Sequence, residues 1–125
     1  MDTKTFTVRI IELLESAIPE LADRIQAGAV DAKTGVPFAA FTMPDEQPIR
    51  TKCGIAGYVV SFEVSVYHNR VSQTEQLRHK VIAALEGASL GEGARASYRS
   101  SQTDYYPDYD IHGATLHFRI VHYDN

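Results

Sequence analysis

The chain of 125 residues has no tryptophan, a single cysteine and no long hydrophobic run. Because Cys53 has no second cysteine to pair with, an internal disulfide is excluded, and the lone thiol favours a reducing compartment. No apolar stretch approaches the roughly 20 residues that a membrane-spanning helix needs. We therefore expect a protein of the cytosol that has no membrane partner.

Positive charge is also scarce. Twelve Lys and Arg residues stand against sixteen Asp and Glu residues, which gives a formal net charge of −4. The longest basic cluster is Arg50-Thr51-Lys52, whereas nucleic-acid-binding proteins usually collect Lys and Arg into a stripe. This balance argues against a surface that grips phosphate, but it is compatible with DNA passing along the protein.

The sequence motifs of common catalytic sites are missing as well. There is no P-loop, no GxGxxG after a strand, no GxSxG and no HExxH. Cys53 lies in a stretch rich in Gly and Pro, without the local signature of a thiolate nucleophile. We expect no catalytic residues and no cofactor, and an enzyme with an unmarked site is the least favoured class.

Five histidines raise the question of a metal. His112, His117 and His122 follow at intervals of five residues, and an odd separation sends neighbours on a strand to opposite faces. Zinc needs three or four converging ligands, so no zinc site is expected. The segment Asp104–Asp110 lacks the glycine and the terminal glutamate of a calcium loop. It is either a solvated turn or a protein contact, because tyrosine brings large contact area at low entropic cost.

Two segments have the periodicity of amphipathic helices. Residues 3–18 form the first, and Pro19 marks its end or a break into a short turn. The second follows a capping-box sequence, Ser72–Glu75, and stops at Gly87. The expected apolar stripes are Phe6, Ile10, Leu13, Leu14 and Ala17 in the first helix and Leu77, Val81, Ala84 and Leu85 in the second.

Two further segments alternate as half-buried strands. Tyr58–His68 places Val60, Phe62, Val64 and Val66 on one face, and Ala114–Tyr123 does the same with Leu116, Phe118 and Ile120. Weaker strands are expected at Phe38–Met43, closed by Pro44, and at Arg95–Thr103, with an additional short strand near Arg24–Val30. The segment Pro44–Gly57, with its prolines and glycines, is predicted to be a long exposed loop, and Asp104–Asp110 a connection.

The length suits one domain, residues 1–125, that can bury a core without a disulfide or metal. The predicted fold class is α+β, with a mostly antiparallel sheet of about four to five strands and two helices packed on one face. The predicted core consists of Phe62, Val64, Leu77, Val81, Leu85, Leu116 and Phe118.

Several short sequence segments, in this order along the chain, resemble those of a known family. They are a strand ending in Pro37-Phe-Ala-Ala-Phe-Thr-Met43, the strand Tyr58–Tyr67, the helix Thr74–Leu85, an Asp/Tyr-containing connection and the final strand Thr115–Ile120. Together they resemble the tail-completion, or tail-terminator, proteins of long-tailed bacteriophages, from about Phe6 to Tyr123. The resemblance does not rest on the loop expected at Pro44–Gly57, which we match to no feature of the family.

The resemblance implies a structural protein of phage or prophage without catalytic residues. Its copies would form a ring, expected to be a hexamer, at the head-proximal end of the tail tube and would join tail to head. The implied partners are other copies of the chain, the tail-tube protein and the head–tail connector protein, with DNA only passing through the lumen. Assembly would take place in the host cytoplasm and the protein would end in the virion tail. The alternative is a small non-catalytic ligand-binding or adaptor domain of similar α+β build.

A closed ring joins two different patches of each chain, so two kinds of surface are expected. The Pro44–Gly57 segment and the tyrosine-rich segment Tyr105–Tyr109 are the candidates, with outward-facing strand positions nearby or facing the lumen. Glu63 is expected to pair across strands with His117 or Arg119. The candidate interface residues are Arg50, Lys52, Glu63, Ser65, Tyr105, Tyr106, Asp108, Tyr109, His117 and Arg119.

Overall fold

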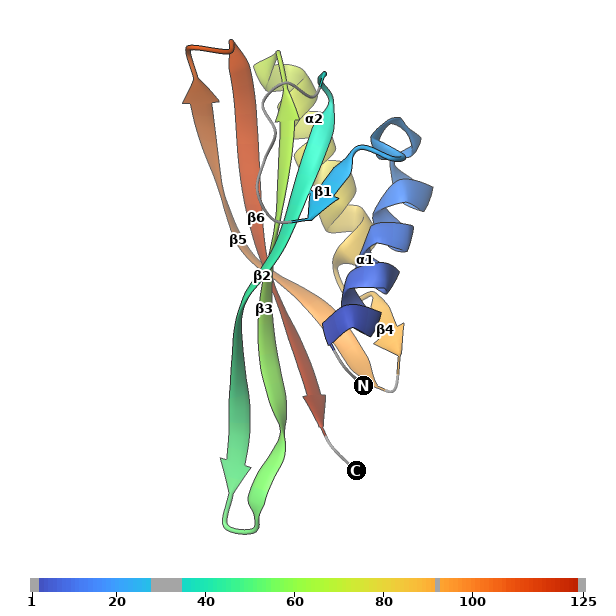
Figure 1. Cartoon of the computed structure of the whole chain (residues 1–125), viewed down its shortest axis with the longest axis vertical. Coiled ribbons are helices and arrows are strands. Elements are labelled where there is room, and N and C mark those ends of the chain that lie inside the picture. The colour runs from blue at the N-terminus through green and yellow to red at the C-terminus, as the bar shows by residue number, and fades with distance from the viewer. Residues whose placement is uncertain (1–2, 28–34, 92, 124–125) are drawn as a thin grey trace.

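The computed structural model of the chain describes residues 3–27, 35–91 and 93–123, and it shows two helices on the same side of a strongly twisted sheet (Figure 1). The elements follow in the order α1 (Thr3–Ala17), a 3-10 turn η1 (Pro19–Leu21), β1 (Ile25–Ala27), β2 (Phe38–Thr51), β3 (Gly54–His68), α2 (Val71–Leu85), β4 (Ser89–Gly91), β5 (Ala94–Tyr106) and β6 (Ile111–Tyr123). Neither helix has the length and apolar character that crossing a membrane requires.

The described strands form one six-stranded sheet in the order β1-β2-β3-β6-β5-β4. Strand β1 runs parallel to β2, and the remaining neighbours are antiparallel. The α+β class with two helices is thus confirmed, whereas the sheet is mixed and larger than the four to five strands expected. The short strand expected near Arg24–Val30 is β1, although residues 28–30 lie outside the described part. Strand β4 escaped prediction because three residues are too few to show an alternating pattern.

The segment Pro44–Gly57 was wrongly expected to be a loop. It forms most of a long β-hairpin, in which β2 continues to Thr51 and pairs with β3 from Gly54 onward, with Pro48 opposite Tyr58. Strand β1 covers the outer edge of β2 only at Ala39–Phe41, so among the described strands this edge is free beyond that point. Proline is tolerated on a free edge because no neighbouring strand needs its missing N–H.

The Asp104–Asp110 segment was wrongly expected to be a connection throughout. Strand β5 continues through Asp104 to Tyr106, which lies opposite Ile111 on β6. Only the four residues 107–110 make the turn, and it closes with Asp110 in a left-handed conformation at φ 49°. The connection is therefore the tip of a second long hairpin.

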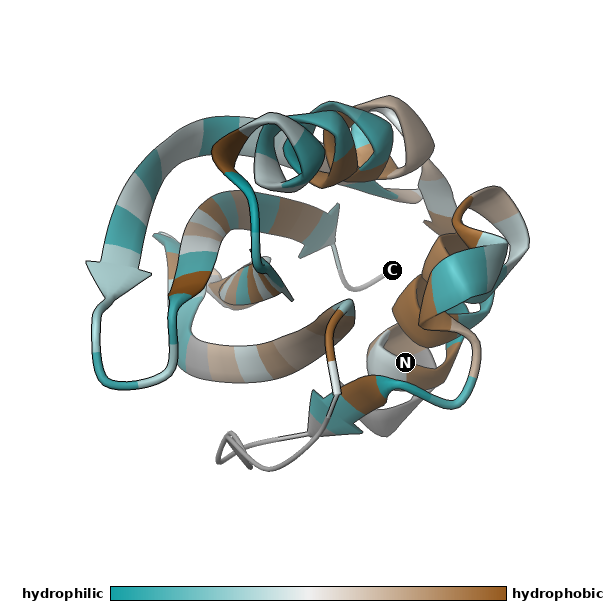
Figure 2. Ribbon diagram, turned by 90° about the horizontal axis from the view of Figure 1, so that it is seen from above, coloured by the Kyte–Doolittle hydropathy of each residue, from teal (hydrophilic) through white to brown (hydrophobic). Residues whose placement is uncertain are grey.

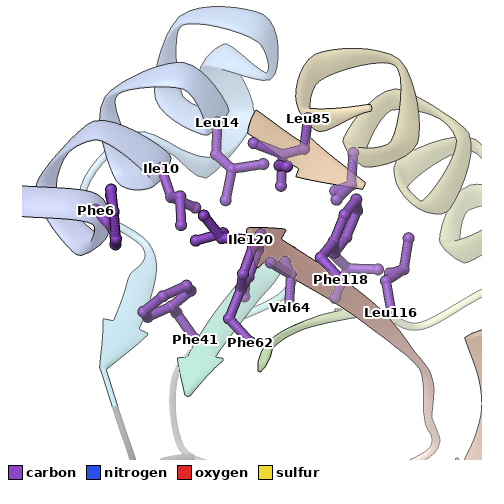
Figure 3. Close-up of a cluster of buried hydrophobic side chains, with 14 of the residues drawn as sticks. Phe6, Ile10, Leu14, Phe41, Phe62, Val64, Leu85, Leu116, Phe118 and Ile120 are labelled. Atoms are coloured by element: carbon purple, nitrogen blue, oxygen red, sulfur yellow. The ribbon is translucent and has the colours of Figure 1, made fainter. Parts of the chain in front are cut away.

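The core lies between the sheet and the two helices (Figure 3). Phe62 on β3 stacks on Phe118 on β6, with ring centroids 5.1 Å apart, and all seven predicted core residues belong to this buried cluster. Helix α1 contributes Phe6, Ile10 and Leu14, whereas Ala17 of its expected stripe is exposed. Figure 2, which looks along the long axis, shows the sheet curving beneath the two helices.

The capping box expected at Ser72–Glu75 does not form. Helix α2 begins at Val71, its N-cap is Arg70, and no side chain caps it. The Oγ1 of Thr74 donates instead to the carbonyl of Arg70 at 2.9 Å, and Glu75 pairs with Arg78 at 2.8 Å. Thr74 is buried, in line with Leu77, Val81 and Leu85. Packing of this face on the sheet has therefore set the start of the helix.

We expect Ser72→Ala to change the free energy of unfolding by less than about 0.5 kcal/mol, because Ser72 is exposed and makes no cap. A capping serine would lose about 1 kcal/mol on the same change. Urea titration followed by circular dichroism measures the difference. Thr74→Ala is the matched control, since it removes a buried hydroxyl and should cost about 1 kcal/mol. A loss of about 1 kcal/mol for Ser72→Ala would show that Ser72 does cap the helix.

Candidate interaction surfaces

The ten candidate interface residues lie in three separate places. Arg50 and Lys52 belong to the tip of the β2–β3 hairpin, the segment 49–56, which we call the basic tip. The tyrosines and Asp108 belong to the tip of the β5–β6 hairpin, residues 104–110, which we call the acidic tip. Figure 1 shows the two tips at opposite ends of the sheet. The remaining four residues lie on the sheet face that the helices leave uncovered.

The basic tip is exposed and well defined. Thr51 Oγ1 donates to the Gly54 carbonyl and accepts from the amide of Cys53, each at 3.2 Å. Both Arg50 and Lys52 are exposed, and so is Ile55 with 46% of its surface accessible. The sequence contains no Asp or Glu between residues 47 and 62, so the positive charge of this tip is uncompensated locally.

The acidic tip has the opposite charge, and a side-chain hydrogen bond spans its turn. The hydroxyl of Tyr105 donates to Asp110 Oδ1 at 3.0 Å, and this hydrogen bond is the main cause that raises the pKa of Tyr105. Tyr105 and Tyr109 expose 50% and 62% of their surface. The sequence contains no Lys or Arg between residues 100 and 118. Exposed aromatic rings on an acidic, ordered turn make a surface suited to a basic partner.

Tyr106 differs from its two neighbours because it also packs against the protein. Its ring lies 6.1 Å from that of Tyr67, and Tyr67 stacks on Phe38 at 4.7 Å. The rings of Tyr67 and Phe38 form a small second cluster with Ala40, separate from the main core. Burial is the first cause that raises the pKa of Tyr67. Tyr67 alternates with Glu63 and Ser65 along β3 but is buried, so this end of their face is drier than its middle.

The helix-free face is polar between the two tips. His117 Nδ1 lies 3.2 Å from Glu63 Oε1, which confirms a cross-strand pair and selects His117 over Arg119. Ser65 and Thr115 share a hydrogen bond of 3.0 Å between their hydroxyls. Arg119 is exposed and lies opposite Ser61. These contacts tie β3 to β6 and leave acidic and basic groups interspersed on the face.

A groove that the sequence did not reveal lies beside the acidic tip. It has a volume of about 270 Å³ and is open on one side. Glu75 lines it, and the hydrogen bond that Arg78 donates to this carboxyl is the main cause that lowers its pKa. The lining residues are Val71, Thr74, Glu75, Thr103, Asp104, Tyr105, His112 and Gly113. They come from α2, β5 and β6, so only the tertiary structure brings them together.

Comparison with known proteins decides the family. The family model described as "Tail completion protein gp17" matches residues 10–123. The chain belongs to this tail-completion family. A chain of a solved structure titled "Virion of native gene transfer agent (GTA) particle" has the same fold, with a TM-score of 0.71, 16% identity and 92% of each chain covered. No curated protein matches the sequence. The resemblance stated from the sequence is confirmed, and the protein is a structural phage tail protein.

The three histidines of β6 in this tail-completion protein each have a different aromatic or acidic neighbour, and His112 also lies opposite His68 on β3. His117 is paired with Glu63, His122 is buried with its ring 5.3 Å from that of Phe6, and His112 lies 4.6 Å from Tyr105. Within residues 3–27, 35–91 and 93–123, no three His, Cys, Asp or Glu side chains are placed to hold a metal ion. Cys53 is a free, exposed thiol at the basic tip.

Removing metal from the tail-completion protein with EDTA is expected to leave its melting temperature unchanged. A metal that binds only the folded state would add stability that grows with the logarithm of its free concentration relative to its dissociation constant, and stripping it would lower the melting temperature. Differential scanning calorimetry before and after dialysis against the chelator makes the comparison. A fall of several degrees that zinc or calcium reverses would contradict this interpretation of the histidines and aspartates.

Proposed function

We propose that this tail-completion protein forms a ring at the head-proximal end of the tail tube and joins the tail to the head. Its membership of the family over residues 10–123 supports a role in tail completion. The observation that carries the ring is the pair of chemically different tips at opposite ends of one sheet. A closed cyclic ring requires such a pair, because each copy offers one patch to the preceding neighbour and another to the next. The proposed ring has six copies, by resemblance to tail terminators.

The proposed partners are the tail-tube protein on one side of the ring and the head–tail connector protein on the other. The chain with a similar fold comes from a virion, which supports assembly with other virion proteins. The protein would assemble in the host cytoplasm and remain in the virion at the head–tail junction.

DNA would pass through the lumen of this ring without being held. The net charge is −4, and the helix-free face pairs Glu63 with His117 rather than presenting a basic stripe. Adhesion to nucleic acid arises mainly from Lys and Arg that displace counterions from phosphate, so this composition favours free passage.

A ligand-binding or adaptor domain is the second candidate function, and the groove is the observation in its favour. Its lining includes the carboxylates of Glu75 and Asp104 and the exposed side chains of Val71 and Tyr105. An open groove with both charged and apolar walls suits an extended segment of protein better than a small molecule, which usually occupies an enclosed and mainly apolar pocket. If the protein is an adaptor, we therefore expect the groove to bind a segment of another protein.

Complementation in vitro tests the proposed function. Tails are purified from a phage of the same kind that lacks this gene, mixed with heads and supplied with the purified protein. We expect joined particles to appear in electron micrographs in proportion to the protein added, and a ring of density at the tube end of tails that have no head. Tails from the intact phage serve as the positive control. Failure of the unmutated protein to cap any tail of its own phage would disprove the assignment.

A further inference from the structure

We propose that neighbouring copies in the ring meet through the basic tip of one copy, which docks in the groove beside the acidic tip of the next. This inference rests on the proposed function and adds which surfaces are in contact. Each copy would contribute Arg50, Lys52 and Ile55 to one neighbour and the groove residues around Tyr105 and Asp104 to the other.

The groove has the chemistry that a basic side chain needs. Lys and Arg carry an apolar stem and a charged head, and they bind best where both parts find a partner. Val71 and Tyr105 line the groove and expose 58% and 50% of their surface, which leaves apolar area for a stem. Asp104 lines the same groove and supplies negative charge for the head, whereas the carboxylate of Glu75 is already paired with Arg78. A planar guanidinium, such as that of Arg50, also stacks on a tyrosine ring.

The groove is accessible from the side of the sheet. Strand β5 has β6 on its inner side, and on its outer side β4 pairs with it at Arg95 and Ala94. Among the described strands, none pairs with the outer edge of β5 at Thr103 or Tyr105, which line the groove. A hairpin tip from another molecule can therefore approach without displacing an element of the fold.

Charge complementarity identifies a second copy as the occupant. No Asp or Glu lies between residues 47 and 62, which include the basic tip, and no Lys or Arg lies between residues 100 and 118, which include the acidic tip. One copy cannot neutralise its own tips, because they lie at opposite ends of the sheet (Figure 1). When two copies lie end to end, the basic tip of one neutralises the acidic tip of the other, and one tip of each sign stays free. Further copies can add to these free tips by the same head-to-tail contact until the ring closes.

The single cysteine allows a direct test by cross-linking. Cys53 is exposed in the basic tip, and Thr103 is exposed in the groove wall. In a Thr103→Cys variant, every copy carries a thiol on both proposed surfaces. We expect mild oxidation or a short bismaleimide on completed tails to produce a ladder of trimers and larger species up to the size of the ring. The unmutated protein has one thiol per copy and can give dimers at most.

Two matched variants control this experiment. Thr103→Cys combined with Cys53→Ser removes one half of each contact and should give no product above a dimer. Glu12→Cys places a second thiol on α1, where the side chain is 60% exposed, away from both tips, and should give no ladder. Absence of the ladder on tails that the Thr103→Cys variant has completed would overturn the inference and leave the proposed function standing. Absence of completion by the unmutated protein would instead count against the proposed function.

A charge exchange keeps the inference testable if the cysteine variant does not assemble. Arg50→Glu with Lys52→Glu, and separately Asp104→Lys with Asp108→Lys, should each lower joining at least about 10-fold, because like charges then face each other. All four changes together should restore joining to within about 3-fold, since the attraction returns with its sign reversed on both surfaces.

Arg9→Glu with Arg99→Glu is the matched control for Arg50→Glu with Lys52→Glu, because it lowers the net charge by the same amount at two exposed positions outside both tips. It should leave joining unchanged. Circular dichroism verifies that each variant is folded. If either reversal alone left joining intact, or if the fourfold variant failed to recover while still folded, the tips would contact other partners and the inference would be wrong.

Discussion

Replacing Phe118 with alanine is expected to remove about 3–5 kcal/mol from the free energy of unfolding, because the ring is fully enclosed and the site cannot collapse around the missing atoms. Only 1% of Phe118 is accessible. It stacks on Phe62 and meets the edge of Tyr98 at 5.6 Å. A domain of this size has about 5–15 kcal/mol in total, so the variant would lose a large part of its stability.

Chemical denaturation with urea, followed by circular dichroism, measures this loss. Tyr123→Ala is the matched control, since it also removes an aromatic ring from β6 but at a position that is 61% exposed. It should change the free energy of unfolding by less than about 0.5 kcal/mol. Equal losses for the two variants would mean that the side of the sheet assigned to the core is wrong.

Replacing Tyr105, Tyr106 and Tyr109 with serine is expected to abolish head–tail joining while leaving the circular dichroism spectrum and the melting temperature nearly intact. Exposed aromatic rings contribute little to folding, but at the centre of an interface each can carry about 2 kcal/mol or more of binding. Loss of three such anchors from every subunit contact would prevent assembly. The measurement is the fraction of joined particles in electron micrographs after complementation.

Because Tyr106 also packs on Tyr67, a double variant that keeps Tyr106 is tested beside the triple variant. Tyr105→Ser with Tyr109→Ser leaves that packing intact and should still lower joining at least about 10-fold. Tyr123→Ser, at the other end of β6, is the control for loss of an exposed tyrosine and should join normally. Full joining activity in the triple variant would show that the acidic tip is not part of the interface.

Much of the fold could be predicted because long elements carry their own periodicity. The strand pattern of Phe62 and Phe118 and the helical pattern of Leu77 identified the faces that meet in the core, and the structure confirms them. The misjudged segments are those where sequence signals were ambiguous. Prolines at Pro44–Gly57 indicated a loop, although a free sheet edge accommodates them. Ser72 had the right spacing for a cap, but burial of Thr74 set the helix start.

The interaction surfaces, too, could be predicted only in part. Composition was enough to select the basic and tyrosine-rich segments, because their charge and aromatic content are local properties. That the two segments are hairpin tips at opposite ends of the sheet depends on the strand register, which the sequence does not show. The groove depends on α2 meeting β5 and β6, so Val71 and Glu75 could not have been chosen in advance.

The location of the protein on the tail is the most direct test of its proposed role. A gold particle coupled to Glu12→Cys in a Cys53→Ser background marks α1 without touching either tip. The labelled protein is added to tails that lack it, and the tails are joined to heads and imaged. We predict gold at the head-proximal end of the tube, between tube and head, on every joined particle. Gold along the tube or at the distal tip, or joined particles without gold, would contradict the account.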